Sequence, residues 1–263
     1  MPKTHGAWIW YELMTADPVG AKAFYEAVVP GWTLQPGSEQ AGGYGFIANT
    51  DGGMTGGVLE LTPGMTEEGC APAWVGYVGV DDCDAAVASI EAAGGRCLMP
   101  ARDVPMAGRI SMVADRDGAP FYVMTPTPPP GGGQSTAFSD QPHNGRCGWN
   151  ELMAADPAGA VSFYTGQFGW SVAGEMDMGE LGYYHFIAHD GGQMGAIFGL
   201  MPGMTQPVWA HYVWVPAINA AKAAIEAHGG QVGNGPMEVP GALWIVQGVD
   251  PQGAFFSLVS EKA

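Results

Sequence analysis

The sequence predicts an α+β fold made of four β-α-β-β-β units, two in each half of the chain. The first observation is a repeat: W-Y-E-L-M-T-A-D-P at residues 10–18 returns as W-N-E-L-M-A-A-D-P at residues 149–157. The second is that helical and strand patterns follow each copy in the same order. The third is a pair of D-x-x-G turns at residues 115–118 and 250–253. The offset, 149 minus 10, is about half the chain, which indicates a duplicated domain because solenoid periods are only roughly 20–50 residues.

The first unit is predicted to open with a strand at residues 8–14 and a helix after it. Asp17 followed by Pro18 is typical of a helix start, because the carboxylate caps free N–H groups and proline suits the first helical position. Apolar residues then recur at i, i+3, i+4 and i+7, as on one helix face. They are Ala21, Phe24, Tyr25 and Val28. Strands are expected near residue 32 and at 44–48 and 54–61, with a loop at 61–66.

The second unit repeats this order. A strand is predicted at residues 74–80, and a helix from the Asp81-Asp82 cap region to Gly94-Gly95, where glycine can end the helix in a left-handed conformation. Two further strands flank the turn at residues 115–118. In the other half the equivalents are the strand 209–215, the helix ending at 229–230 and the turn 250–253.

Composition favours a small-molecule ligand over a macromolecular one. The chain has 263 residues, 47% of them apolar, and a formal net charge of −17. Such an acidic balance argues against binding to nucleic acid or to an anionic membrane. No secretory signal or long apolar span is visible. The cysteines lack C-x-x-C spacing and are predicted to be reduced thiols. We therefore expect a cytoplasmic protein, monomeric or homodimeric.

A Pro- and Gly-rich segment separates the two copies. It begins T-P-T-P-P-P-G-G-G at residue 125 and shows no apolar periodicity. The sequence therefore predicts a first domain at residues 1–126, a linker at 127–142 and a second domain at 143–263.

Taken together, these motifs resemble a known superfamily. They are the D-P-x-x-A-x-x-F-Y helix, the Gly-Trp after it, the segment V-D-D-x-D-A-A-x-x-x-I-x-A-A-G-G at residues 80–95, and the D-x-x-G turn. The resemblance is to the vicinal oxygen chelate superfamily, which includes glyoxalase I, extradiol dioxygenases and the bleomycin resistance proteins. The nearest likeness is to two-domain glyoxalase-like proteins. It implies tandem vicinal-oxygen-chelate domains whose cupped mixed sheets hold a ligand, usually with a divalent metal.

The metal ligands that the resemblance implies are not found in this chain. The corresponding positions carry side chains that are poor ligands: Trp10, Trp149, Val75, Ala210, Tyr122 and Ser257. Glu60 resembles one family carboxylate, but Gly199 takes its place in the other half. A transition-metal site needs several converging donors. We therefore expect no metal and no cofactor.

The residues expected to line the two cups are instead mostly aromatic. Strand alternation places Trp8, Trp10, Glu12 and Met14 on one face. If that face lines the cup, the predicted ligand-binding residues are Trp10, Met14, Tyr77, Arg109 and Tyr122 in the first half and Trp149, Met153, His185, Tyr212, Trp214 and Trp244 in the second. Such cups suit a flat apolar or cationic molecule held by stacking. Alternatively, the aromatic residues simply close the core.

Two features give the cups chemistry and make them unequal. Glu12 and Glu151 lie mid-strand between apolar neighbours, where an unpaired carboxylate is costly. They are the predicted catalytic residues, as a general acid or base, although a structural role stays open. Arg109 aligns with Trp244, and His185 has no counterpart in the first half. The two cups are therefore not expected to be equivalent.

Two functions remain. The first is metal-independent binding or sequestration of a small, aromatic molecule, and the alternative is a glyoxalase-like lyase or isomerase acting on a small carbonyl compound. The sequence does not decide whether the protein is an enzyme.

Overall fold

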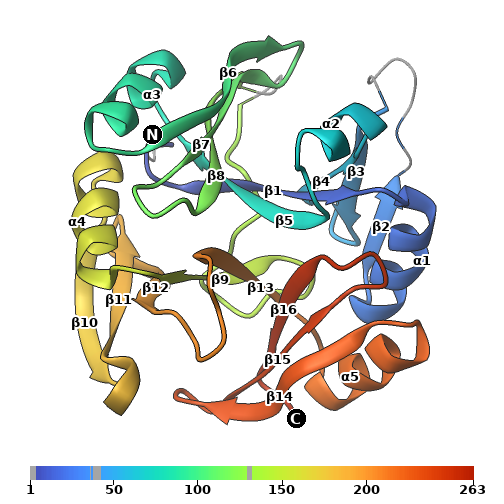
Figure 1. The fold of residues 1–263 in the computed structure, drawn as a ribbon. Helices are drawn as coiled ribbons and strands as arrows, with labels where there is room; N and C mark the ends of the chain where they lie inside the picture. The colour runs from blue at the N-terminus through green and yellow to red at the C-terminus, as the bar shows by residue number, and fades with distance from the viewer. Residues whose placement is uncertain (1–3, 36, 38–42, 129–131) are drawn as a thin grey trace. The chain divides into compact units, whose positions relative to one another are not determined.

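The computed structural model describes residues 4–35, 37, 43–128 and 132–263, and it confirms the α+β class and the four β-α-β-β-β units. Each half contributes one eight-stranded mixed sheet (Figure 1). The strand order is β2-β3-β4-β1-β5-β8-β7-β6 in the first sheet and β10-β11-β12-β9-β13-β16-β15-β14 in the second. The two orders are the same, because each strand of the second sheet takes the place of its counterpart in the first copy.

The first half contains eight strands and three helices among its described residues. They are β1 (Trp8–Thr15), α1 (Pro18–Val28), β2 (Trp32–Gln35), β3 (Gly45–Asn49), β4 (Met54–Glu60), α2 (Pro63–Glu67), β5 (Ala73–Gly79), α3 (Cys83–Ala92), β6 (Arg96–Val104), β7 (Gly108–Ala114) and β8 (Pro120–Pro126).

The second half repeats this order of strands, with a 3-10 turn, η2, between β10 and β11 and with no counterpart of α2 among its described residues. Its elements are β9 (Cys147–Ala154), α4 (Pro157–Phe168), β10 (Ser171–Asp177), η2 (Gly179–Leu181), β11 (Tyr183–His189), β12 (Gly192–Gly199), β13 (Val208–Trp214), α5 (Ile218–Ala227), β14 (Gln231–Val239), β15 (Leu243–Val249) and β16 (Phe255–Ser260).

The predicted helix starts are confirmed at their caps. The carboxylate of Asp17 accepts a hydrogen bond from the backbone N–H of Gly20, and Asp156 does the same for Gly159. Asp82 caps α3 in the same way. One expectation was wrong: residues 61–66 were predicted as a loop, but they hold α2. The reason is a helix cap that was not recognised. The side chain of Thr62 accepts a hydrogen bond from the backbone N–H of Met65, and Pro63 occupies the first helical position.

The chain packs as two compact units, and each unit takes segments from both halves. The first unit comprises Met1–Ile9, Gly76–Ser135 and Trp149–Trp209, and the second comprises Trp10–Val75, Thr136–Gly148 and Ala210–Ala263. Residues 129–131 of the predicted linker lie outside the described residues, and the rest of it forms no helix or strand. The predicted division into domains 1–126 and 143–263 follows the sequence repeat, and its boundaries differ from those of the compact units.

In the second unit the core lies around α1 and α5, which pack together (Figure 1). Phe24 and Tyr25 of α1 contact Phe256 of β16, with ring centroids 5.6 and 5.9 Å away. The buried hydroxyl of Tyr25 donates to the carboxylate of Asp250 at 3.0 Å and accepts from the indole N–H of Trp74 at 2.8 Å. Burial and the charge of Asp250 hold the pKa of Tyr25 well above its usual value, so the phenol keeps its proton.

The first unit has the same arrangement. The hydroxyl of Tyr164, on α4, donates to Asp115 at 3.1 Å and accepts from the indole N–H of Trp209 at 3.0 Å. Burial raises the pKa of Asp115 although four N–H or O–H donors serve it. Trp8 belongs to this core, with its ring centroid 5.0 Å from that of Trp209. Trp8, which alternation places on the same strand face as Trp10, thus packs into the core around α4 at the start of β1.

A buried histidine in the second unit makes stability depend on pH. His211, on β13, packs its ring against Tyr11 at 4.9 Å, and burial lowers the pKa of His211 to about 3. The unfolded chain takes up this proton near pH 6.5, whereas the folded chain does not until near pH 3. The contribution of neutral His211 to the free energy of unfolding is therefore fully present above pH 6.5. It is lost progressively as the pH falls from about 6.5 toward 3.

As the pH falls from 6.5 to 5, protonation of His211 in the unfolded chain is expected to lower the free energy of unfolding by about 2 kcal/mol. The slope is about 1.4 kcal/mol per pH unit. Urea unfolding of the parent protein and of His211→Gln at pH 7 and pH 5 checks this. The variant is expected to lose less stability on acidification. An identical loss in both proteins would contradict the assignment.

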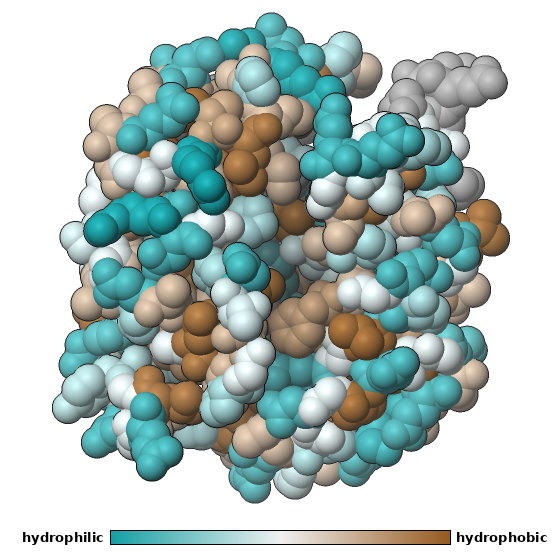
Figure 2. Space-filling view, in the orientation of Figure 1, coloured by the Kyte–Doolittle hydropathy of each residue, from teal (hydrophilic) through white to brown (hydrophobic). Residues whose placement is uncertain are grey.

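The protein surface in Figure 2 is mixed in polarity, and the described helices are short. On the face shown in Figure 2, apolar side chains are scattered in small groups among polar ones, as on an ordinary protein surface. Among the described residues the longest helix, α4, has 12 residues, and no helix is both long and apolar enough to cross a membrane.

Candidate functional site

Most of the candidate site residues are assigned by strand alternation to the face of each sheet that points away from the helices, here called the cup face. On β1, Leu13 packs into the helical core of the second unit. Alternation along the strand therefore places Glu12 and Met14 on the cup face. The glycine at position 57 pairs with Glu12 on β4, and its missing side chain leaves room for the ring of Tyr44.

In the second half, a hydrogen-bonded chain of three side chains occupies the cup face. The indole N–H of Trp149 donates to the hydroxyl of Tyr184 at 2.8 Å, and that hydroxyl donates to Oε1 of Glu151 at 2.7 Å. Phe186 packs beside them, 6.3 Å from Trp149 and 5.2 Å from Tyr184 between ring centroids. We call these four residues the Trp149 cluster. All of them belong to the first compact unit.

The first half carries the matching set in the second compact unit. The indole N–H of Trp10 donates to the hydroxyl of Tyr44 at 2.9 Å. Phe46 lies 6.3 Å from Trp10 and 5.6 Å from Tyr44 between ring centroids. With Glu12, which is 2% exposed, these residues form the Trp10 cluster. The duplication has thus preserved a Trp-Tyr-Phe-Glu set in both copies.

The electrostatics of the Trp149 cluster fix where its protons are. Burial first, and then the negative charge of Glu151, raise the pKa of Tyr184 far above its usual value. The phenol is therefore neutral at physiological pH and acts as a donor to the carboxylate. Because the indole N–H and the carboxylate are both bound to Tyr184, the position of the indole ring beside the carboxylate is fixed.

The two tyrosines were missed by the sequence analysis, although a signal for them existed. Residues 44–48 spell Y-G-F-I-A and residues 184–188 spell Y-H-F-I-A, at an offset of 184 minus 44. Only the glycine and the histidine differ. Comparing the halves strand by strand, beyond the longer W-x-E-L-M repeat, would have identified Tyr44 and Tyr184 as shared residues.

Other predicted site residues form two further groups. Tyr77 and Tyr122 are register partners on β5 and β8 of the first unit, and their rings stack at 4.1 Å and 15°. In the second unit, Tyr212 accepts a hydrogen bond from Gln247 at 2.8 Å. The remaining predicted residues are buried: Met14, Met153 and Trp214.

Three predicted site residues lie on the helix side of the sheets instead of the cup face. Arg109 donates to both carboxylate oxygens of Asp84, at the start of α3, at 2.6 and 2.8 Å. Its counterpart Trp244 packs against the helical core of the second unit. His185 alternates with Tyr184 and Phe186, so its ring points to the opposite face. The sequence analysis placed these residues in the cups because it could not fix the strand faces near the sheet edges.

His185 and Arg109 are both engaged by carboxylates. The ring of His185 is 2.9 Å from Glu175 on the neighbouring strand. The hydrogen bonds that Arg109 donates to Asp84, and then to Asp103, raise the pKa of Arg109. Both side chains therefore have partners within the protein.

The divalent metal implied by the family resemblance does not fit the residues present. Trp10 and Trp149 stand at the first ligand position, and an indole N–H is a donor that cannot coordinate a metal. Tyr122 stands at another, stacked on Tyr77. Within the described ranges, no three His, Cys, Asp or Glu side chains converge as a metal site would require. We therefore derive no metal-dependent step.

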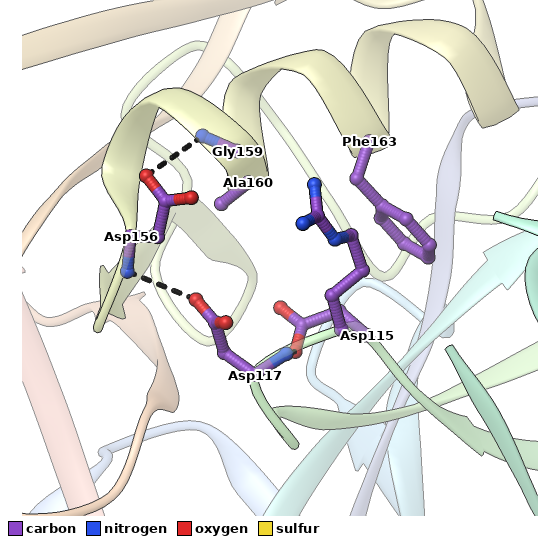
Figure 3. A pocket seen from close by; sticks show the side chains of 7 residues that line it. Asp115, Asp117, Asp156, Gly159, Ala160 and Phe163 are labelled. Carbon is purple, nitrogen blue, oxygen red and sulfur yellow. Dashed lines mark hydrogen bonds between the residues drawn. The ribbon is translucent and has the colours of Figure 1, made fainter. Parts of the chain in front are cut away.

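A hollow at the start of α4 is a capping arrangement (Figure 3). The carboxylate of Asp156 accepts from the backbone N–H of Gly159 at 3.0 Å, and Asp117 accepts from that of Asp156 at 2.9 Å. Phe163 closes one side. The hollow has almost no enclosed volume, whereas small-molecule pockets measure roughly 300–1,000 Å³. Two of the carboxylates that line the hollow thus accept hydrogen bonds from backbone N–H groups at the start of α4.

Comparison with known proteins places the chain in a family. Residues 9–123 match the model of the Glyoxalase/Bleomycin resistance protein/Dioxygenase superfamily. The chain is 31% identical to "Putative glyoxylase CFP32" of Mycobacterium bovis over 95% of this chain and 93% of that protein. It is 30% identical to "Anthracycline biosynthesis protein DauV" of Streptomyces sp. strain C5, over 97% and 93%.

Solved structures share the fold at lower identity. The Mn(II)-bound glyoxalase from Novosphingobium aromaticivorans superimposes with a TM-score of 0.66 at 18% identity, covering 98% of this chain and 83% of that one. The 2,2',3-trihydroxybiphenyl 1,2-dioxygenase of Sphingomonas wittichii gives 0.66 at 13% identity, covering 97% and 90%. This chain belongs to the glyoxalase/bleomycin resistance protein/dioxygenase superfamily.

Proposed function

We propose that this protein binds and sequesters a small, flat aromatic molecule on the cup face of its sheets, without a metal. The observation that carries the proposal is the duplicated Trp-Tyr-Phe-Glu cluster. In both copies the indole N–H is bound to a tyrosine, which holds the indole ring in one orientation. A fixed aromatic surface favours stacking with a planar ligand because little side-chain freedom is lost on binding.

The carboxylates define the polar end of such a ligand. Glu151 is 9% exposed and is held by the hydroxyl of Tyr184. A carboxylate beside aromatic rings favours a ligand with a hydroxyl, amine or other positive group. The net charge of −17 favours a neutral or cationic ligand in the same way.

The relatives support an aromatic ligand. One relative is named for anthracycline biosynthesis, and anthracyclines are flat polycyclic aromatic compounds. The acidic charge balance also keeps nucleic acids and anionic membranes outside the proposal.

Binding of 1,8-dihydroxyanthraquinone by equilibrium dialysis tests this function. Trp149→Ala is expected to weaken binding roughly tenfold, because a stacked aromatic contact contributes about 1.4 kcal/mol. Tyr184→Phe is expected to weaken it less, by freeing the indole and the carboxylate from their fixed positions. Arg109→Gln, on the helix side, is the matched control and should leave affinity unchanged. Binding that none of these variants alters would exclude the Trp149 cluster.

A second function, a glyoxalase-like lyase or isomerase acting on a small carbonyl compound, rests on one observation. Glu12 and Glu151 are buried carboxylates on the cup faces, where either can act as a general base. Turnover of methylglyoxal with a thiol, followed by proton NMR, tests it. Activity lost in Glu151→Gln or Glu12→Gln at unchanged folding would favour catalysis over sequestration.

A further inference from the structure

We propose that the second sheet carries a hydrogen-bonding site for the polar group of an aromatic ligand, centred on Gln247. The ligand class is a neutral aromatic compound bearing a hydroxyl or carbonyl group, as phenols and quinones do. This inference rests on the proposed function, since it takes an aromatic ligand as given. It adds a set of uncharged hydrogen-bonding groups on the second sheet to the carboxylates of the Trp10 and Trp149 clusters.

The site begins with a chain of amide and hydroxyl groups across three strands of the second unit. The side-chain amide of Asn234, on β14, donates to Oε1 of Gln247 at 2.9 Å. Nε2 of Gln247, on β15, donates to the hydroxyl of Tyr212, on β13, at 2.8 Å. On β15, Val246 packs into the core, so Gln247 points to the cup face. Exposure falls along the chain, from exposed Asn234 through half-buried Gln247 to Tyr212.

The amide of Gln247 retains binding capacity. A glutamine side chain has two N–H donors and an oxygen with two lone pairs. Tyr212 takes one donor and Asn234 uses one lone pair. One donor and one acceptor position therefore remain on a half-buried group. A hydroxyl can use both, and a carbonyl can use the donor.

A second observation points to the same face. Ser257, on β16, is the register partner of both Tyr212 and Gln247. Its neighbours Phe256 and Leu258 pack into the helical core, so alternation turns Ser257 toward the cup face. Its side chain is fully buried, and its hydroxyl has no hydrogen-bond partner among the described residues. A buried unpaired hydroxyl costs stability, and a polar ligand group is a partner that would relieve that cost.

The first sheet shows that the scaffold does not require these residues. At an offset of 135, the offset of the two D-x-x-G turns (250 minus 115), the counterparts carry apolar or stacked side chains. They are Met99 for Asn234, Met112 for Gln247, Tyr77 for Tyr212 and Tyr122 for Ser257. The strand pairing is the same, with Met99 opposite Met112 and Met112 opposite Tyr122. Thioethers are only weak acceptors, so at the positions of Asn234 and Gln247 the second sheet offers amide groups where the first offers apolar side chains.

A pair of probes with the same ring system tests the proposal: naphthalene, and 2-naphthol, which adds one hydroxyl. We expect the parent protein to bind 2-naphthol more tightly in equilibrium dialysis. Gln247→Met, which installs the residue of the first sheet, is expected to weaken 2-naphthol roughly tenfold, the effect of one lost hydrogen bond. Naphthalene affinity should stay within about twofold. Met112→Leu, at the matched position of the first sheet, should change neither.

A second variant keeps the test independent of folding defects. Ser257→Ala removes only the unpaired hydroxyl and is expected to keep or raise the melting temperature while weakening 2-naphthol. Loss of the preference for 2-naphthol in either variant, at an unchanged melting temperature, supports the polar site. Retention of that preference in both variants overturns it and leaves the proposed function standing if naphthalene still binds. Failure of both probes to bind the parent protein overturns the proposed function as well.

Discussion

Residues 1–126 expressed alone are expected not to fold as a stable monomer, and neither are residues 143–263. The reason is that the core of each compact unit is shared between the halves. In the second unit, the buried cluster takes Leu13, Phe24 and Tyr25 from the first half. It takes Ile218 and Phe256 from the second. Each large apolar side chain left exposed costs about 1.5–3 kcal/mol, so losing several exceeds the roughly 5–15 kcal/mol that stabilises a typical domain.

The measurement is circular dichroism and size-exclusion chromatography of each fragment, alone and after co-expression. Co-expressed fragments are expected to form a 1:1 complex with the secondary structure of the intact chain. Cleavage of the intact protein between residues 126 and 142 is the control, and it should leave that complex associated. A fragment that unfolds cooperatively as a monomer would show instead that the predicted domains 1–126 and 143–263 are independent.

Asp115→Ala is expected to lower the free energy of unfolding by about 3–5 kcal/mol, because the side chain serves four donors at once. One oxygen accepts from the backbone N–H groups of Asp117, Gly118 and Ala119 at 2.8–3.0 Å. The other accepts from the hydroxyl of Tyr164 at 3.1 Å. Removing the carboxylate leaves these donors without their partner and breaks both the D-x-x-G turn and its link to α4.

Urea unfolding of a graded set of variants checks this. Asp250→Ala, at the matching position of the other unit, should cost somewhat less, because that carboxylate accepts from the backbone of Gln252 and Ala254 and from Tyr25. Asp82→Ala removes an exposed helix cap with one hydrogen bond and should cost only about 1 kcal/mol. Equal effects of all three substitutions would show that the buried network adds nothing.

Local signals predicted most of the fold. The cap at Asp17, the helix face that includes Phe24 and Tyr25, and the turn at residues 115–118 all depend on nearby residues, and all are confirmed. The repeat then extended each element to the other half. The loop at 61–66 was wrong because Thr62 and Pro63 were not recognised as another helix start.

Contacts between distant segments were beyond the sequence. Alternation separated Glu12 from Leu13, but it could not indicate that the ring of Trp8 packs against Trp209. Arg109 was expected in a cup, and its partner Asp84 lies 25 residues away on a helix that no spacing rule connects to it. The crosswise assembly of the two units was equally hidden, since a repeat reveals that copies exist but not which surfaces they share.

That crosswise assembly constrains how the two copies can diverge. A change at Tyr25 must be accommodated by Asp250 in the opposite copy, and a change at Tyr164 by Asp115. Substitutions in the helix layer of one copy are thus restricted by the residues of the other copy that pack against it. Cup-face positions such as Met112 and Gln247 are not restricted in this way, and there the two copies have different residues. The duplication preserves one architecture twice over while leaving two surfaces free to acquire different specificities.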